Sequence, residues 1–388
     1  MRGLEQGSAS VSTRPTKKTG MRIIGVYDRN FQQHLIDHNI YPHAYTYSDK
    51  NVPTKPTNWK DIKDTLAQRR PSLESSVCDE KYFERFVRAD ANVPKEKQVS
   101  ETVIPILEGM VEDIRCRSGG IPFTNLDPLT DGTLKFGNPD VYYGARPENL
   151  RREVRTELDG RIIPSTQDHL PIAPNFFLAV KGPDGPPIVA ERSAWYDGAL
   201  GARGMESLES YGQGESENGT AYTISSIYQC GVLKMYASYL TQPSSPGGRP
   251  SYHMAQIDAW VLTGNADTFR QGVRAYRNAR DWAEKQRDNL IRRANEKAAL
   301  PKAEVTNDIE ADASPALSPV AAASDTEAHT KSQEPRTTLN EGSNGLGVFE
   351  ESDSSAESFA ATRVTTTRSN KRKRRSTDVE SEARPRAD

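Results

Sequence analysis

The segment 174–182, with the sequence PNFFLAVKG, constrains the fold most strongly because it is the most apolar stretch of the chain. It begins with a proline, and Gly-Pro-Asp-Gly at 182–185 ends it. A short apolar run between such turn-forming residues is typical of a strand that is buried on both faces. The segment therefore predicts the central strand of a sheet.

The pattern on either side of this strand predicts a mixed sheet flanked by helices, an α/β or α+β fold. Ala190, Ala194, Gly198 and Ala202 recur at a spacing of four, which predicts a helix that packs closely on the sheet. Further strands are expected at 133–136, 140–143, 221–228, 232–240 and 252–262, with a hairpin turn at 229–231. Further helices are expected at 31–36, 58–66, 79–90, 99–114 and 146–158, and in a long segment capped by Asn265.

Composition divides the chain into four parts. Only 35% of the residues are hydrophobic, and the last 88 contain no Trp or Tyr and 11 residues of Ile, Leu, Val and Phe together. Such a segment buries too little apolar surface to offset the entropy of ordering its backbone. We therefore expect disorder at 1–20 and 299–388, an irregular helical arm at 21–95 and a core domain at 96–298.

Charge and hydropathy bear on partners and localisation. The formal net charge is −2, so no overall field draws the protein to nucleic acid or membrane. No apolar run approaches the roughly 18–20 residues that a membrane-spanning helix needs, and residues 1–20 lack the apolar region of a secretion signal. Five consecutive cations, Lys371, Arg372, Lys373, Arg374 and Arg375, form either a nuclear-import signal read by an import receptor or a solvated charge run. The expected localisation is nuclear, otherwise cytoplasmic.

Asp140 and Lys181 are the pair of residues with the most chemical content. Asp140 follows Pro139 at one expected strand, and Lys181 ends the buried strand. Positions i and i+2 of a strand share a face, so an aspartate and an acid-x-Lys motif on neighbouring strands can converge. Mg²⁺ prefers hard oxygen ligands, and a nearby cation stabilises developing phosphate charge. This arrangement resembles the PD-(D/E)xK nuclease superfamily, whose core is restriction-endonuclease-like.

The second acid of that motif is missing, because position 179 is Ala. If Mg²⁺ is bound, Asp140 is the one metal ligand that the motif itself supplies. Asp168, Asp184 and Glu191 are alternative sources of the missing carboxylate, and Glu101, Glu108 and Glu112 are candidates for a third one from the preceding helix. The alternative interpretation makes Asp140 a turn residue and Lys181 an ordinary lysine at a strand end.

Other motifs carry weaker signals. Glycine-rich phosphate loops and a nucleophile elbow are absent from the sequence. His34 and His38 could share a helix face as metal ligands, but without a companion motif they are more typical of surface histidines. Arg270, Arg274 and Arg277 share one face of the long helix and are candidates for phosphate contacts. The alternative is a solvated face paired with Asp281, Glu284 and Asp288.

A longer resemblance covers residues from about 31 to 298. It is carried by the strings GIPFTNLDPLTDGTL (120–134), NPDVYYGARPE (138–148), IIPSTQDHLPIAPNFFLAVKGPDG (162–185), YDGALGARGMESLESYG (196–212), AYTISSIYQCGVLKMY (221–236) and TGNADTFRQGVRAYRNARDWAEKQRD (263–288). These resemble a family of filamentous-fungal proteins known as a domain of unknown function. The resemblance implies a fungal, nuclear or cytoplasmic setting and a restriction-endonuclease-like fold, and it implies no particular activity.

Three functions are compatible with these observations. The first is a nuclease-like domain that binds nucleic acid through a degenerate or inactive site at Asp140 and Lys181. The second is a non-catalytic protein-interaction module. The third is an active Mg²⁺-dependent nuclease with a displaced acidic ligand. Whether the chain is an enzyme, and its oligomeric state, are left open by the sequence.

Overall fold

The structure is a computed structural model that describes residues 23–213, 218–243, 245 and 247–300 of the 388-residue chain. The regions expected to be disordered, 1–20 and 299–388 with its basic run 371–375, lie outside the described residues except for Ala299, the last residue of a helix, and Leu300. Among the described residues, none of the helices combines the length and the apolar character needed to cross a bilayer.

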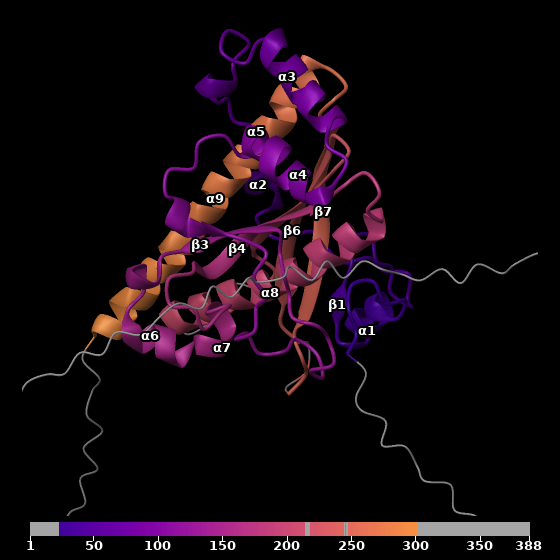
Figure 1. Ribbon diagram of the computed structural model, residues 1–388. Coiled ribbons are helices and arrows are strands. Elements are labelled where there is room, and N and C mark those ends of the chain that lie inside the picture. Colours follow the sequence, from indigo (N-terminus) through magenta and orange to yellow (C-terminus); the bar gives the residue numbers. More distant parts are fainter. Residues whose placement is uncertain (1–22, 214–217, 244, 246, 301–388) are drawn as a thin grey trace, which may run out of the picture. The chain divides into compact units, whose positions relative to one another are not determined.

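A seven-stranded mixed sheet with the order β1-β7-β6-β5-β4-β3-β2 forms the centre of the fold. Its pairs are antiparallel except for β1–β7 and β4–β5, which are parallel. The strands are β1 (Ile40–Tyr41), β2 (Arg117–Ser118), β3 (Val141–Ala145), β4 (Ile172–Lys181), β5 (Ala221–Gln229), β6 (Val232–Thr241) and β7 (Ser251–Val261). The predicted mixed sheet flanked by helices is confirmed (Figure 1).

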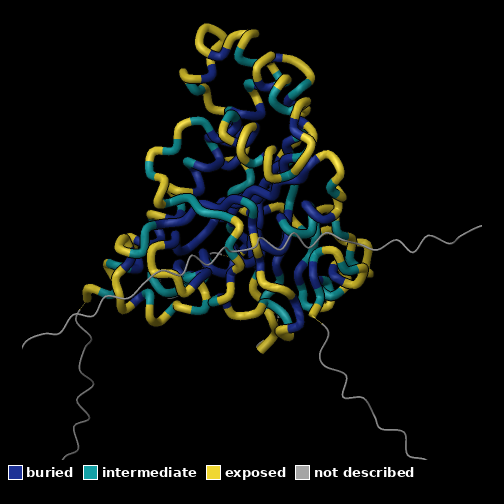
Figure 2. Tube along the Cα trace, in the orientation of Figure 1, coloured by how far each residue is buried: buried dark blue, intermediate teal, exposed yellow. Residues whose placement is uncertain are grey.

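Strand β4 is the buried central strand that the apolar segment predicts. All ten of its residues are buried, and it lies between β3 and β5. Its side chains alternate between two hydrophobic clusters: Phe176, Leu178 and Val180 belong to one, and Phe177 and Ala179 to the other. Figure 2 shows the buried positions gathered around the sheet. The alternation fixes which face of β4 carries Lys181.

Two long helices cover the two faces of the sheet. Helix α9 (Ala266–Ala299) contributes Phe269, Val273 and Tyr276 to the cluster that contains Val180. Helix α8 (Pro187–Gln213) contributes Ala190 and Ala194 to the cluster that contains Ala179.

The small-residue stripe of α8 does allow close packing. A Cβ atom at Gly198 would lie 2.3 Å from the Ser238 hydroxyl oxygen, so a larger residue there would have to displace this side chain. The predicted cap of α9 is also confirmed, because the Asn265 side chain accepts a hydrogen bond from the Thr268 N–H at 2.8 Å.

The hairpin and the N-terminal helices follow the sequence pattern. Cys230 and Gly231 turn between β5 and β6 with φ values of 48° and 71°. Helices α1 (Phe31–Asp37), α2 (Trp59–Ala67) and α3 (Glu80–Ala91) lie where they were expected. Ile62 of α2 and Phe86 of α3 belong to the same hydrophobic cluster as α9, so these helices share its core.

The predicted continuous helix 99–114 is wrong. The segment forms α4 (Glu96–Gln98), a π-helical turn (Val99–Val103) and α5 (Ile104–Glu108), and it ends at Gly109, which has a φ of 65°. Met110 and Ile114 are exposed beyond that end. A positive φ at Gly109 terminates the helix before the periodic pattern runs out.

Two other predicted elements differ from expectation: the helix is divided into shorter pieces, and the strand is reduced to a single bridge. The segment 146–158 contains a 3-10 turn (Pro147–Asn149) and α6 (Arg152–Glu157), followed by α7 (Asp159–Ile162). The expected strand 133–136 makes only one isolated parallel bridge, between Ile24 and Leu134.

Two more 3-10 turns lie at Pro71–Leu73 and Ile114–Cys116.

Candidate functional site

Asp140 and Lys181 line the same cavity, which has a volume of about 350 Å³. Asp140 immediately precedes β3, and Lys181 is the last residue of β4. The antiparallel register pairs Val141 with Leu178, so the start of β3 lies beside the end of β4. Oδ2 of Asp140 accepts a hydrogen bond from the backbone N–H of Val180 at 2.7 Å. Two residues 41 positions apart in the sequence are thus held at one site.

The ammonium group of Lys181 forms an ion pair with Glu96 of α4. Its Nζ donates to Oε1 of Glu96 at 2.7 Å, and the Lys181 side chain is 8% exposed. Burial lowers the pKa of Lys181, but the carboxylates of Asp140 and Glu96 outweigh it, and the net pKa is raised. Lys181 is therefore a buried cation at the site.

A glycine allows Glu96 to reach this position. A Cβ atom at Gly182 would lie 2.7 Å from the backbone nitrogen of Glu96, so the chain at α4 passes directly against the residue that follows Lys181. The preceding helical segment thus supplies Glu96 as its carboxylate, in place of the expected Glu101, Glu108 or Glu112. Gly182 is a signal that could have indicated a close backbone approach.

The carboxyl group of Asp140 has a pKa of about 6. Burial raises the pKa most, and the Glu96 carboxylate raises it further. The Lys181 charge and the Val180 N–H lower it. Near neutral pH this carboxyl group therefore exchanges between its acid and base forms more readily than an exposed aspartate does.

Asp197 of α8 is a second buried carboxyl group at the site and was not among the residues expected there. It lines the same cavity and is 2% exposed. Burial, and to a smaller extent the Asp140 charge, raise its pKa well above its usual value, so its neutral form is favoured. The available signal was a single acid within the small and apolar run SAWYDGALGA, at the helix face that packs on the sheet.

The carboxylates proposed earlier for this site lie elsewhere. Glu108 is buried on the α9 face of the sheet, where it accepts hydrogen bonds from Arg117 at 2.8 and 3.0 Å and from the Tyr143 hydroxyl at 2.7 Å. Glu112 lines a different cavity beside Arg277, and Glu101 is exposed.

The alternative acids for position 179 do not line the cavity either. Asp168 and Asp184 are exposed, and Glu191 pairs with Lys234 at 2.8 Å. If another described residue supplies the missing acid, it must be one that lines the cavity, such as Asp197.

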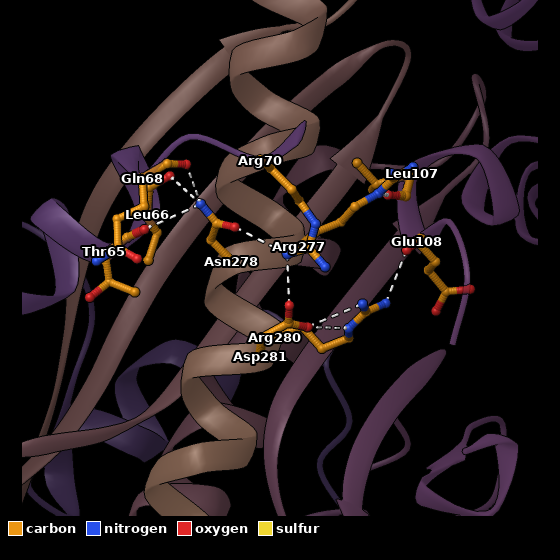
Figure 3. A network of polar contacts seen from close by, with 10 residues as sticks. All are labelled: Thr65, Leu66, Gln68, Arg70, Leu107, Glu108, Arg277, Asn278, Arg280 and Asp281. Atoms are coloured by element: carbon orange, nitrogen blue, oxygen red, sulfur yellow. Dashed lines mark hydrogen bonds and ion pairs between the residues drawn. The ribbon is translucent and has the colours of Figure 1, made fainter. Parts of the chain in front are cut away.

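The three arginines of α9 do not form one exposed face. Arg277 is buried and donates to the carbonyl oxygen of Leu107 at 3.0 Å, with both residues drawn in Figure 3. It also donates to the carbonyl oxygen of Ile106 at 2.9 Å. Arg270 donates to the carbonyl of Cys78 at 2.9 Å, and Arg274 is half-buried. Arg277 is thus bound to the end of α5, and a contact of these arginines with phosphate stays a prediction.

The alternative expectation, that these arginines pair with Asp281, Glu284 and Asp288, is wrong. Asp281 binds Arg70 and Arg280, as Figure 3 shows, whereas Glu284 and Asp288 lie near Arg287. These three acids therefore neutralise other arginines than the ones considered from the sequence, whereas Asp267 in the first turn of α9 pairs with Arg270.

The carboxylates of the cavity do not make a compact metal site as they lie. Among the described residues, the one group of three potential ligand atoms within 4.8 Å of one another belongs to His34, His38 and Asp131. Glu96, Asp140 and Asp197 offer the oxygen ligands that Mg²⁺ prefers, but with a wider spacing.

No protein-family model, curated protein or solved structure matches the chain. The function is therefore inferred from the geometry of the site.

Proposed function

We propose that the chain is a nuclease-like domain that binds nucleic acid and whose site at Asp140 and Lys181 is catalytically impaired. The observation that carries the proposal is the convergence of these two residues, with Glu96 and Asp197, in one cavity of about 350 Å³. Perturbed pKa values in such a cavity are typical of functional sites.

The order of elements around the cavity supports the resemblance to a restriction-endonuclease-like core. A helical segment with Glu96 comes first, followed by the antiparallel pair β3–β4. Helix α8 then crosses over to β5, which lies parallel to β4. In that family the acids and the lysine come from the equivalent elements.

Two features support impaired catalysis. The methyl group of Ala179 replaces the second acid, and Lys181 is engaged by Glu96. The residues present do not fit a bound Mg²⁺ without rearrangement, because their oxygen atoms are too widely spaced. Binding without efficient cleavage is the activity that this arrangement favours.

Asp197 favours a second candidate, an active metal-dependent nuclease with a displaced acid. It lies in the cavity and interacts electrostatically with Asp140. If Glu96 turned away from Lys181, three carboxyl groups would be available to a metal ion, and Lys181 would be free to stabilise charge on a phosphate.

Assays of cleavage and binding with the full-length chain separate these functions. Single-stranded and double-stranded DNA and RNA are incubated with Mg²⁺ or Mn²⁺, and the wild type is compared with Asp140→Ala. We expect no metal-dependent product above background, together with binding that weakens as salt increases. Cleavage that is lost in Asp140→Ala would establish the second candidate instead.

Failure to bind any nucleic acid at low salt would refute the proposal and leave a protein-interaction module. Of the three arginines, Arg274 is the remaining candidate for a phosphate contact. Arg274→Ala should lower the slope of log affinity against log salt by about 1 if it makes such a contact.

The basic run Lys371–Arg375 is proposed as a nuclear-import signal on the basis of its sequence. A fluorescent fusion of the full chain should accumulate in the nucleus, and replacement of the five cations by alanine should abolish this. Equal nuclear accumulation of both fusions would contradict the import signal.

A further inference from the structure

His34 and His38 lie one helical turn apart at the end of α1, with ring centroids 4.5 Å apart. Nδ1 of His38 lies 2.8 Å from the carbonyl oxygen of His34. A carbonyl oxygen can only accept, so Nδ1 of His38 must carry the hydrogen in this contact. In the neutral ring the lone pair then lies on Nε2. A metal-binding histidine is commonly oriented by a hydrogen bond of this kind.

Asp131 reaches the same place from a segment 97 positions later. Its Oδ1 lies 3.3 Å from Nε2 of His34. The backbone N–H and the hydroxyl of Thr133 donate to this oxygen at 3.0 and 2.6 Å, so the carboxylate is held in place without the histidines. The potential ligand atoms of all three residues lie within 4.8 Å of one another.

The spacing of His34 and Asp131 fits a tetrahedral metal ion. With metal–ligand distances of about 2.0–2.2 Å, two neighbouring ligand atoms of a tetrahedron lie roughly 3.3–3.6 Å apart. The distance between His34 and Asp131 is in that range. Two imidazole nitrogens and one carboxylate oxygen suit Zn²⁺ better than Mg²⁺ or Ca²⁺, which prefer oxygen ligands alone.

We propose that His34, His38 and Asp131 bind a zinc ion, with the fourth coordination position left to water. This site is separate from the cavity at Asp140 and does not depend on the proposed function. It needs a small movement of His38 toward the other two ligands. The alternative is that no metal binds and that His34 and Asp131 form a simple hydrogen-bonded pair.

The site would connect two segments that border the Asp140 cavity. Helix α1 begins at Phe31, and residues 135–138 follow Asp131 closely; both line the cavity. The backbone of Ile24 already binds this second segment, through Thr133 at 2.8 Å and Lys135 at 2.9 Å. A zinc ion at the three ligands would fix α1 to the same segment by a second connection.

Zinc titration of the tag-free, full-length protein in competition with a chromogenic chelator tests the site. We expect one tight equivalent in the wild type, and an affinity at least tenfold weaker in His38→Ala and in Asp131→Asn. Asn keeps an acceptor for the Thr133 hydrogen bonds, so Asp131→Asn separates ligand loss from misfolding. His169→Ala, which removes an exposed histidine elsewhere, should bind zinc as the wild type does.

Two further readouts follow the same variants. Zinc should raise the Tm of the wild type and of His169→Ala, and it should leave the Tm of Asp131→Asn nearly unchanged. Co²⁺ should give the strong visible absorption of a tetrahedral site in the wild type. Equal zinc affinity of the wild type, His38→Ala and Asp131→Asn would overturn the proposal.

Discussion

Lys181 at the end of β4 is neutralised by Glu96, which precedes it by 85 positions, with 2.7 Å between Nζ and Oε1. The same two charges act on Asp140 in opposite directions: Lys181 lowers its pKa, and Glu96 raises it. The protonation of Asp140 therefore depends on an ion pair in which it takes no part. This relationship makes the electrostatics of the cavity testable without knowledge of a ligand.

Glu96→Gln should lower the pKa of Asp140 from its value of about 6. The substitution removes a negative charge that raises this pKa and releases Lys181 from its ion pair, so both changes favour the ionised aspartate. The titration of the Asp140 carboxyl carbon can be followed by NMR. Glu191→Gln is the matched control, because Glu191 pairs with Lys234 outside this cavity. An unchanged or higher pKa in Glu96→Gln would contradict the arrangement.

Asp140→Asn should stabilise the protein at neutral pH. In the folded state the Asp140 pKa is about 6, above its usual value of 3.8. The folded state therefore holds this proton more tightly than the unfolded chain, and stability falls as the pH rises from about 4 to about 6. Asn cannot ionise and can still accept the Val180 N–H, so the variant avoids this loss.

Urea denaturation at pH 4.5 and pH 7.5 measures the effect. The free energy of unfolding of Asp140→Asn relative to the wild type should increase by about 1–3 kcal/mol between the two conditions. A difference that does not change with pH would mean that the carboxyl group titrates normally. Burial of a functional carboxyl group costs stability, so a substitution that removes the group at a candidate site is expected to stabilise the protein.

The centre of the fold could be predicted because its signals are local. The strand ending at Lys181 is apolar on both faces, the hairpin has Gly231 at its turn, and Asn265 caps α9. The π-helical turn at Val99–Val103 and the helix end at Gly109 could not, because the apolar spacing of 99–114 continues through both. Where the periodic pattern persists, a helix end is set by backbone conformation that the pattern does not report.

The candidate site was predicted in part. Strand parity brings Asp140 and Lys181 to the α8 face, since Ala179 and Lys181 are i and i+2. Glu96 and Asp197 come from other elements, and tertiary packing brings the backbone of Glu96 against Gly182 and the side chain of Asp197 against Gly137. The glycines are visible in the sequence, but the residues that pack against them are not.

His253→Phe should remove a loss of stability in acid. Burial lowers the pKa of His253 to about 4, so the folded state keeps the ring neutral while the unfolded chain takes up a proton near its usual value of 6.5. Stability is then lost as the pH falls from about 6.5 to about 4. The ring stacks on Tyr41 and Tyr239, with centroids 5.6 and 5.1 Å apart, and Phe preserves this stacking.

Thermal or urea unfolding between pH 7 and pH 4 gives the comparison for His253. The wild type should lose about 2–3 kcal/mol more than His253→Phe over this range. The unfolding free energy changes with pH in opposite directions for His253 and Asp140, and the wild-type profile contains both contributions. Each variant is therefore compared with the wild type at every pH. Parallel profiles of the wild type and His253→Phe would contradict a neutral buried ring.

Gly109→Ala should destabilise the protein by about 2–4 kcal/mol. Gly109 has a φ of 65° and a ψ of −148°, a conformation open mainly to glycine. A Cβ atom there would also lie 2.5 Å from Cζ of Arg277, whose guanidinium binds the carbonyl oxygens of Ile106 and Leu107. The substitution therefore disturbs both the backbone and the contact that fixes the end of α5.

Gly120→Ala is the control that separates these two effects. Gly120 has a similar φ of 67°, but a Cβ atom there would meet nothing within 4 Å, so its substitution should cost only about 1 kcal/mol of backbone strain. Urea denaturation of both variants, alone and combined with Arg277→Ala, completes a double-mutant cycle. The cost of Gly109→Ala should shrink by about 1 kcal/mol or more in the Arg277→Ala background, whereas that of Gly120→Ala should stay the same. Additive effects at Gly109 would show that Arg277 does not press against it.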